Sequence, residues 1–203
     1  IFCYGPMYGI QLAFRKYDFS KGLTGGDWVG FKYFTQYFTS PMFMPTLRNT
    51  FIISFFTLVC GFPAPIFLAL VINSLRQKKI KRVIQTAVYM PYFISTVVLV
   101  AMLQILLSPS TGVVSGLLRK IHFISESTNL LGSPSAFVPV YVISGIWQSA
   151  GWNSIIFIAA LSSVDGELYD AAKIDGADRW HQMIHLELPA LVPTIVILLI
   201  MNM

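Results

Sequence analysis

Long stretches without a single charged side chain constrain this chain more than any other feature of its sequence. Asp, Glu, Lys and Arg are absent from residues 49–75, 83–118, 127–164 and 188–203. A helix needs about 20 apolar residues to cross the hydrocarbon layer of a bilayer, and the first three runs exceed that length. Membrane-spanning strands would instead give segments of about ten residues that alternate with a period of two. The sequence therefore predicts an all-α integral membrane protein.

The overall composition agrees with this class. Hydrophobic residues make up 55% of the chain and charged residues only 11%, whereas a soluble domain carries roughly 25% charged residues. The net charge of +5 is typical of Lys and Arg in cytoplasmic loops, so we expect contact with membrane lipid and none with nucleic acid. Cys3 and Cys60 lie in apolar runs without metal-ligand or redox spacing, which indicates small hydrophobic side chains.

The uncharged runs predict spans near residues 45–73, 84–107 and 136–162. Residues 1–14 are apolar but shorter than a span, and no basic region precedes them, so we interpret them as the distal half of a transmembrane helix rather than a signal peptide. Residues 190–203 also stop before a bilayer would be crossed. We therefore expect a piece of a longer protein with an incomplete helix at each end.

A basic loop at residues 76–82 sets the orientation of the spans. Five of its seven residues are Lys or Arg, and the positive-inside rule places such a loop in the cytoplasm. Residues 15–48 hold the same number of basic residues spread over 34 positions, among glycines and aromatic rings. This segment is typical of an external interfacial region, with a sugar-stacking surface as the alternative. Alternation of the spans then makes residues 164–189 cytoplasmic.

The cytoplasmic loop 164–189 concentrates negative charge, because it holds six of the nine acidic residues of the chain. Its first part predicts a short helix over residues 168–173, with Asp165 or Glu167 near the helix start, where the helix dipole favours an acid. Leu168, Ala171 and Ala172 follow the spacing i, i+3, i+4 and would form a small apolar face that another surface can approach closely.

The second part of the loop predicts another short helix over residues 178–187. Gly176 would separate the two helices, since glycine adopts positive φ without steric cost. Pro189 would end the second helix, because the residue before a proline is pushed out of the helical region. His181 and His185 are four residues apart, but no HExxH glutamate or third ligand accompanies them, so we expect no metal site.

Polar side chains within the predicted span 136–162 are the candidates for a solute path. Ser144 and Gln148 lie one helical turn apart and share a face. Polar groups in a span face other helices or a wet cavity. Two interpretations stay open: hydrogen bonds between helices, worth about 0.6–2 kcal/mol each, or the lining of a path for a polar solute.

The spacing in the acidic loop resembles the EAA signature of permease subunits of bacterial binding-protein-dependent ABC importers. That signature reads Glu-Ala-Ala, three residues, Gly, nine residues and Ile-x-Leu-Pro. The chain has Asp170-Ala171-Ala172, then Gly176, then Leu186-x-Leu188-Pro189. It departs by Asp for Glu at 170 and by Leu for Ile at 186, and both changes keep the chemical type. Residues 8–10, 91–95 and 145–153 resemble the oligosaccharide and polysaccharide branch, which includes lipoprotein-B-like permeases.

This resemblance implies a MetI-like helical bundle, commonly of six transmembrane helices, in the bacterial cytoplasmic membrane. Residues 1–44 would be the end of the first helix plus an external segment, and residues 45–203 the permease domain. The implied partners are a second permease subunit, identical or different, cytoplasmic ATPase subunits that carry the ATP, and an extracytoplasmic solute-binding protein. The chain itself would be non-catalytic, would hold no cofactor or metal, and would pass an oligosaccharide inward.

The resemblance also implies which residues meet the ATPase. These contacts would be made by Leu168, Asp170, Ala171, Ala172, Asp175, Gly176, Ala177, Leu186, Leu188 and Pro189. Ser144 and Gln148 stay the candidates for the solute path on the strength of their polar side chains alone. Asp170 and Asp175 suggest contacts to basic groups of the ATPase.

Two other classes of function remain as alternatives. A carrier or channel driven by an ion gradient would place ionisable groups inside its spans. The three complete spans contain no Asp, Glu or Lys, and their one arginine, Arg48, lies at the end of the first span. A membrane-embedded enzyme would need a catalytic set such as HExxH or GxSxG, which the sequence lacks. Co-purification of an ATPase distinguishes the importer subunit from both.

Overall fold

The structure is a computed structural model that describes residues 6–18, 20, 22, 26–75, 77–122, 124–125 and 129–202. The chain forms two compact units, Ile1–Phe51 and Ile52–Met203. Helices dominate both, and the described residues include two isolated β-bridges but no β-strand. The expected all-α class is confirmed.

The first unit contains the 3₁₀ helix η1 (Pro6–Ala13), α1 (Lys32–Phe38) and most of α2 (Phe43–Phe56). Residues 6–13 form a 3₁₀ helix, a geometry used in short pieces, and the expectation that residues 1–14 are the end of a transmembrane helix stays a prediction. Pro6 and Gly9 are both poor α-helix formers. The turn at Gly30 has a positive φ of 58°, as its residue type predicts.

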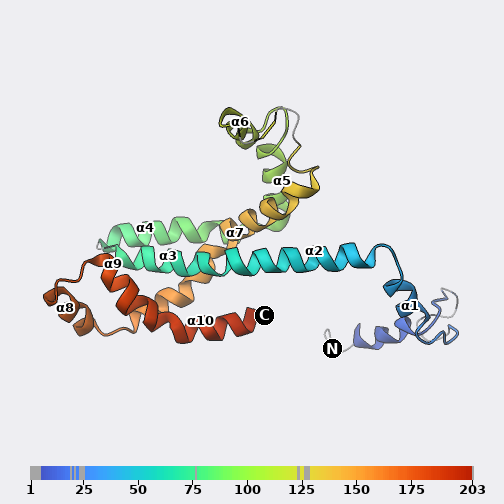
Figure 1. The fold of residues 1–203 in the computed structure, drawn as a ribbon, viewed down its shortest axis with the longest axis horizontal. Helices are drawn as coiled ribbons and strands as arrows, with labels where there is room; N and C mark the ends of the chain where they lie inside the picture. The colour runs from blue at the N-terminus through green and yellow to red at the C-terminus, as the bar shows by residue number, and fades with distance from the viewer. Residues whose placement is uncertain are drawn as a thin grey trace. The chain divides into compact units, whose positions relative to one another are not determined.

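The second unit is a bundle of helices packed around α7. Its elements are η2 (Thr57–Gly61), α3 (Pro63–Ser74), α4 (Lys78–Tyr89), η3 (Met90–Phe93), α5 (Thr96–Leu106), α6 (Val113–Lys120), α7 (Pro134–Ser162), α8 (Gly166–Ile174), α9 (Arg179–Gln182), η4 (Met183–Glu187) and α10 (Leu188–Asn202). α3 and α4 lie side by side, and α7 crosses α3 and packs against α10 (Figure 1).

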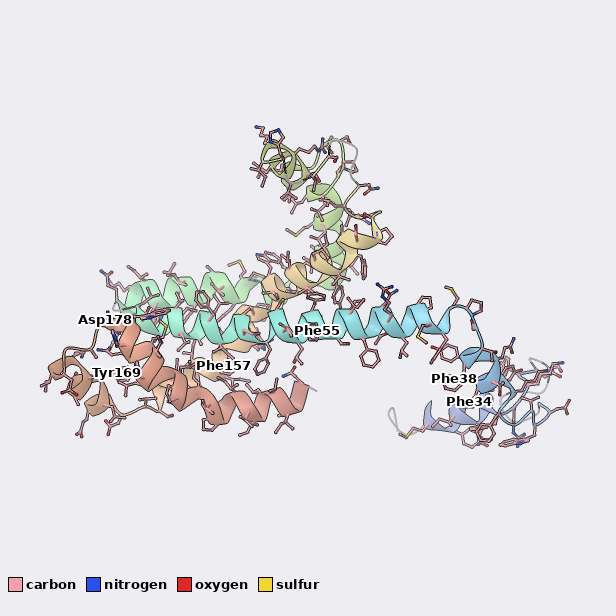
Figure 2. The ribbon with its side chains drawn as sticks, in the orientation of Figure 1. Phe34, Phe38, Phe55, Phe157, Tyr169 and Asp178 are labelled. Atoms are coloured by element: carbon pink, nitrogen blue, oxygen red, sulfur yellow. The ribbon has the colours of Figure 1, made fainter. Side chains whose placement is uncertain are left out.

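The core of this unit lies where α3, α7 and α10 meet. Its buried members are Ala69, Leu70, Ile72, Phe157, Ile158, Leu161 and Leu191. Phe157 points into this junction (Figure 2). Most other large apolar side chains of the spans are exposed, for example Val97 at 79% and Ile105 at 71%. A membrane-spanning bundle presents such side chains to lipid tails, so it needs only a small internal core.

In the part of the chain that the structure describes, two continuous helices are long and apolar enough to cross a membrane: Phe43–Ser74 with 32 residues and Arg179–Asn202 with 24. A third crossing is possible if Lys78–Phe93 and Thr96–Leu106, which meet at 98°, form one broken span. The span expected over residues 84–107 is therefore bent rather than one continuous helix. Pro91 lacks a backbone donor, and the extended Ser95 caps the next helix by accepting a hydrogen bond from the Val98 amide at 3.4 Å.

The fourth predicted span, residues 136–162, forms the single helix α7 of 29 residues. Its length would suffice for a bilayer. Serine, glycine, glutamine and asparagine in its middle make it less apolar than the two long helices, and it is not among the helices that qualify as spans by composition. Its crossing of the membrane remains an expectation.

Two prolines inside the long helices come directly after π-helical turns. η2 comes just before Pro63, and η4 comes just before Pro189 at the start of α10. A proline inside a helix has no amide to donate and its ring clashes with the carbonyl four residues earlier, and local π-helical adjustments let membrane helices tolerate it. The helix from Arg179 therefore runs through Pro189, and the prediction that it ends there is wrong.

Gly151 marks the place where α7 approaches α4 most closely. A Cβ atom added at Gly151 would overlap the Val88 carbonyl, whereas a Cβ at Gly145 would meet nothing within 4 Å. We expect Gly151→Ala to lower the stability of the purified protein by about 1–3 kcal/mol, as overpacking usually does. Gly145→Ala on the same helix is the matched control. Thermal unfolding checks both, and an equal midpoint for the two variants would contradict the close approach.

Candidate functional site

The first half of the acidic loop forms helix α8, which protrudes from the second unit. Asp165 caps it by accepting a hydrogen bond from the Glu167 amide at 3.0 Å, as its position near the helix start predicted. No residue of α8 is buried. Leu168 is 50% exposed and Ile174 is 87% exposed. Figure 1 shows α8 away from the packed helices, so an apolar side of this helix remains open.

A glycine-dependent turn ends α8. Gly176 has a positive φ of 78°. The Ala177 amide donates to the Ala172 carbonyl at 2.9 Å and the Gly176 amide donates to the Lys173 carbonyl at 3.1 Å, the pair of bonds that defines a Schellman motif. Gly176 therefore separates two helices as predicted, and it fixes the direction in which the chain leaves α8.

The acidic residues of the signature lie at the surface of α8 and its end. Asp170 accepts a hydrogen bond from Lys173 at 2.7 Å, but both side chains are largely exposed, at 74% and 61%. An exposed pair of this kind contributes little to stability, so Asp170 can exchange Lys173 for another cation. Asp175 is exposed at the C-terminal end of the helix.

The second half of the signature lies beyond the turn, in the helix that leads into α10. Leu186 falls in η4 and is half-buried, while Leu188 and Pro189 form the exposed first turn of α10. The structure therefore divides the signature into an exposed part on α8 and a part built into the long helix. His181 Nδ1 is hydrogen-bonded to the Asp178 carboxylate. His185 Nδ1 is hydrogen-bonded to the His181 carbonyl.

Asp178 starts the second helix of the loop. The His181 backbone amide, at 2.8 Å, and then the His181 side chain hold the pKa of Asp178 below its usual 3.8. A lowered pKa means that this stabilisation is present above pH 3.8 and is lost as the pH falls further. We expect Asp178→Ala to raise amide exchange in α9 at neutral pH, and Asp178→Asn, which still caps a helix, to change it less. Hydrogen exchange measures this, and equal exchange in both variants would exclude the cap.

The sequence did not single out a polar cluster beneath α8. Glu187 is only 2% exposed. Its Oε1 accepts hydrogen bonds from Asn73 Nδ2 at 2.8 Å and from the Tyr169 hydroxyl at 3.3 Å. Lys81 Nζ donates to Asn73 Oδ1 at 3.1 Å. Burial raises the pKa of Tyr169, and the negative charge of Glu187 adds to this rise, so the phenol stays a hydrogen-bond donor.

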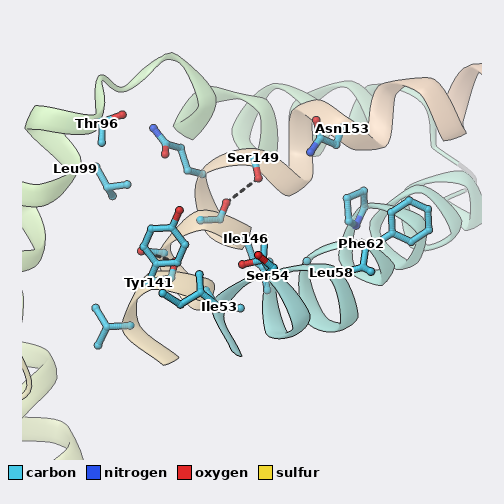
Figure 3. Close-up of a pocket in the computed structure, with 18 of the residues that line it drawn as sticks. Ile53, Ser54, Leu58, Phe62, Thr96, Leu99, Tyr141, Ile146, Ser149 and Asn153 are labelled. Atoms are coloured by element: carbon cyan, nitrogen blue, oxygen red, sulfur yellow. Dashed lines mark hydrogen bonds between the residues drawn. The ribbon is translucent and has the colours of Figure 1, made fainter. Parts of the chain in front are cut away.

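A cavity of about 990 Å³ opens between α2, α3, α5, α7 and α10 on the second unit. Its lining is apolar with scattered neutral polar groups, and the described residues that line it include no charged side chain. The polar members are Ser54, Thr57, Thr96, Gln104, Tyr141, Ser144, Gln148, Ser149, Asn153 and Asn202. Figure 3 shows Tyr141, Ser149 and Asn153 of α7 around this space together with Ser54 and Thr96.

Ser144 and Gln148, the two residues proposed from the sequence to line a solute path, both lie in this lining. Their hydrogen bonds differ. Gln148 Nε2 donates to the Ile94 carbonyl at 2.7 Å, where the bent pair of helices breaks. Ser144 Oγ donates to the Tyr141 carbonyl of its own helix at 3.1 Å. Gln148 thus makes the interhelical hydrogen bond of the first interpretation and also lines a cavity. Ser144 lines the cavity without a bond to another helix.

Residues 61–203 match the family described as the inner membrane component of binding-protein-dependent transport systems. The chain belongs to this family. The family resemblance inferred from the acidic loop is therefore confirmed, and the matched residues include the cavity-lining helix α7 and the whole loop.

Relatives and solved structures support the same family. The chain is 42% identical over 202 residues to the polygalacturonan/rhamnogalacturonan transport system permease protein YteP of Bacillus subtilis, covering 100% of this chain and 62% of the relative. It is 40% identical to Protein LplB of the same organism, with 63% of that protein covered. A crystal structure of a bacterial ABC transporter involved in import of the acidic polysaccharide alginate superposes with a TM-score of 0.86 at 40% identity, covering 100% of this chain and 66% of that one. The chain thus spans somewhat less than two thirds of these proteins.

Proposed function

We propose that this chain is part of a permease subunit of an ATP-driven importer in the bacterial cytoplasmic membrane. The observation that carries the proposal is helix α8, an exposed helix with an open apolar side that ends in the Gly176 turn. Within a family of binding-protein-dependent transport components, such a helix suits a groove on a cytoplasmic ATPase. ATP binding by that partner would move α8, and the chain itself would remain non-catalytic.

The proposed contact surface for the ATPase follows the two parts of the loop. Leu168, Ala171 and Ala172 provide the apolar contact, and Asp170 and Asp175 meet basic groups of the partner. Ala177, Leu186, Leu188 and Pro189 shape the turn and the start of the long helix. The further partners are a second permease subunit and an extracytoplasmic solute-binding protein. A related alginate transporter has been crystallised in complex with an alginate pentasaccharide-bound periplasmic protein.

We infer that the solute is an oligosaccharide. The cavity offers hydroxyl and amide groups, which bond sugar hydroxyls, next to the ring of Tyr141. Such a mixture of apolar surface and a few polar groups is typical of small-molecule sites. The names of YteP and of the alginate transporter mention polysaccharides, which favours the same class here. Ser144 and Gln148 are the proposed path residues.

Purification of the full-length protein from membranes of its own host tests the partner assignment. We expect an ATPase to co-purify and the complex to hydrolyse ATP, with more hydrolysis when the solute-binding protein and its sugar are added. A full-length protein that is purified intact without any ATP-hydrolysing partner would contradict the proposal. Uptake driven by an ion gradient alone would favour the carrier alternative.

A further inference from the structure

A buried carboxylate connects the loop to the transmembrane helices. Glu187 is 2% exposed and lies in η4, where an apolar residue would be the ordinary choice for a helix entering a membrane. Burying a carboxylate without hydrogen bonds costs free energy, so the partners of Glu187 help to hold it in this position. Those partners are Asn73 at the end of α3 and Tyr169 of α8, both donating to the same oxygen, Oε1.

The cluster connects two distant parts of the chain, α3 and α4 on one side and α8 and η4 on the other. Asn73 and Glu187 are 114 positions apart, and Tyr169 and Glu187 are 18 apart. Lys81 of α4 adds a further hydrogen bond to Asn73 Oδ1. The same few atoms therefore connect α8, the long helix of the loop, the last turn of α3 and the first turn of α4, which contains part of the basic stretch 76–82.

We propose that Glu187 is a positioning residue that carries movement of α8 to the transmembrane helices through Tyr169 and Asn73. α8 has no buried residue, so apolar packing does not fix it to the bundle. The Tyr169 hydroxyl provides that connection, and Figure 2 shows Tyr169 at the loop end of the unit. Because both donors share one oxygen, a shift of α8 changes the bond that holds the end of α3.

The hydrogen bonds of the cluster also predict which property of Glu187 matters, its acceptor oxygen or its charge. Replacing a buried ionic group by an apolar one of similar volume is often neutral or stabilising. Leucine at position 187 should therefore fill the space and preserve the fold while it removes the acceptor. Glutamine keeps an Oε1 acceptor for Asn73 and Tyr169, so it should restore the connection without the charge.

The test uses the full-length transporter, and it rests on the proposed function. Solute transported per ATP hydrolysed is measured for wild type, Glu187→Leu, Glu187→Gln, Tyr169→Phe and the control Glu167→Gln, an exposed glutamate of the same loop. We expect Glu187→Leu, which removes the acceptor of both hydrogen bonds, to lower this ratio about tenfold, an effect within the range of two ordinary hydrogen bonds. Glu187→Gln and the control should stay near wild type, and Tyr169→Phe should fall in between.

Three outcomes would overturn the proposal, and each can be told apart from failure of the proposed function. A wild-type ratio for Glu187→Leu at equal expression would exclude the positioning role. Glu187→Gln as impaired as Glu187→Leu would show that charge, not the hydrogen bonds, is what matters. If the Glu187→Leu protein does not reach the membrane, the transport ratio of Tyr169→Phe serves as the test instead.

Amide exchange of α8 is a second measurement, and it does not depend on transport. We expect faster exchange in Glu187→Leu and Tyr169→Phe only, and no change in either variant would contradict the connection.

Discussion

In the proposed importer, replacement of Gly176 by valine is expected to abolish solute uptake while the protein still reaches the membrane. The backbone at Gly176 has a φ of 78°, a region in which a β-branched side chain collides with its own backbone. Such strain costs of order 1–3 kcal/mol, so the turn would adopt another conformation and α8 would point elsewhere. ATP hydrolysis by the partner should then continue without transport, which is measured as uptake and phosphate release in the same vesicles.

Two further variants separate the turn geometry from general damage. Gly176→Asn should keep most uptake, because asparagine tolerates the left-handed conformation better than other residues. Gly166→Val changes a glycine at the start of the same helix, where φ is not positive and a Cβ would meet nothing within 4 Å, so it should be mild. Wild-type uptake in Gly176→Val at normal expression would exclude the turn as a determinant of coupling.

A tryptophan at position 144 is expected to block the cavity. Ser144 lines the space on α7 and makes only a local hydrogen bond, so the larger ring would extend into the cavity rather than displace a partner helix. We expect uptake to fall by about tenfold or more, which corresponds to roughly 1.4 kcal/mol of added barrier. Assembly with the ATPase should be unchanged, and radiolabelled sugar uptake with parallel purification measures both.

The neighbouring position offers the matched control. Ile143 is 66% exposed on the same helix and is not part of the cavity lining, so Ile143→Trp adds the same ring away from the cavity and should leave uptake near wild type. If the two variants transport equally, the cavity is not the solute path. If Ser144→Trp binds no ATPase, the loss of uptake has another cause, and the assignment of Ser144 to the path would have to be withdrawn.

The residues that could be predicted from sequence are those whose role depends on local rules. Asp165 caps α8, Gly176 turns with positive φ, and the uncharged runs become helices. Each of these outcomes follows from the residue type and its immediate neighbours. The spacing from Asp170 to Pro189 was specific enough to indicate the family before any comparison was made.

The features that sequence did not reveal depend on how distant segments pack. Pro189 was expected to end a helix, but the π turn η4 before it lets the helix continue. The break at Ile94 is supported by Gln148, 54 positions away. In the sequence, Glu187 is only one of several acidic residues of the loop. The residues next to it in the chain do not show that Asn73 lies within hydrogen-bonding distance.

The most direct test of the central claim is uptake by the full-length protein reconstituted in liposomes with its second permease subunit, its ATPase and the solute-binding protein. We expect oligosaccharide to enter only when ATP is supplied, and uptake to stop when the ATPase carries a substitution that prevents hydrolysis. Accumulation of solute under an imposed ion gradient, without ATP or with the inactive ATPase, would contradict the assignment of this chain to an ATP-driven importer.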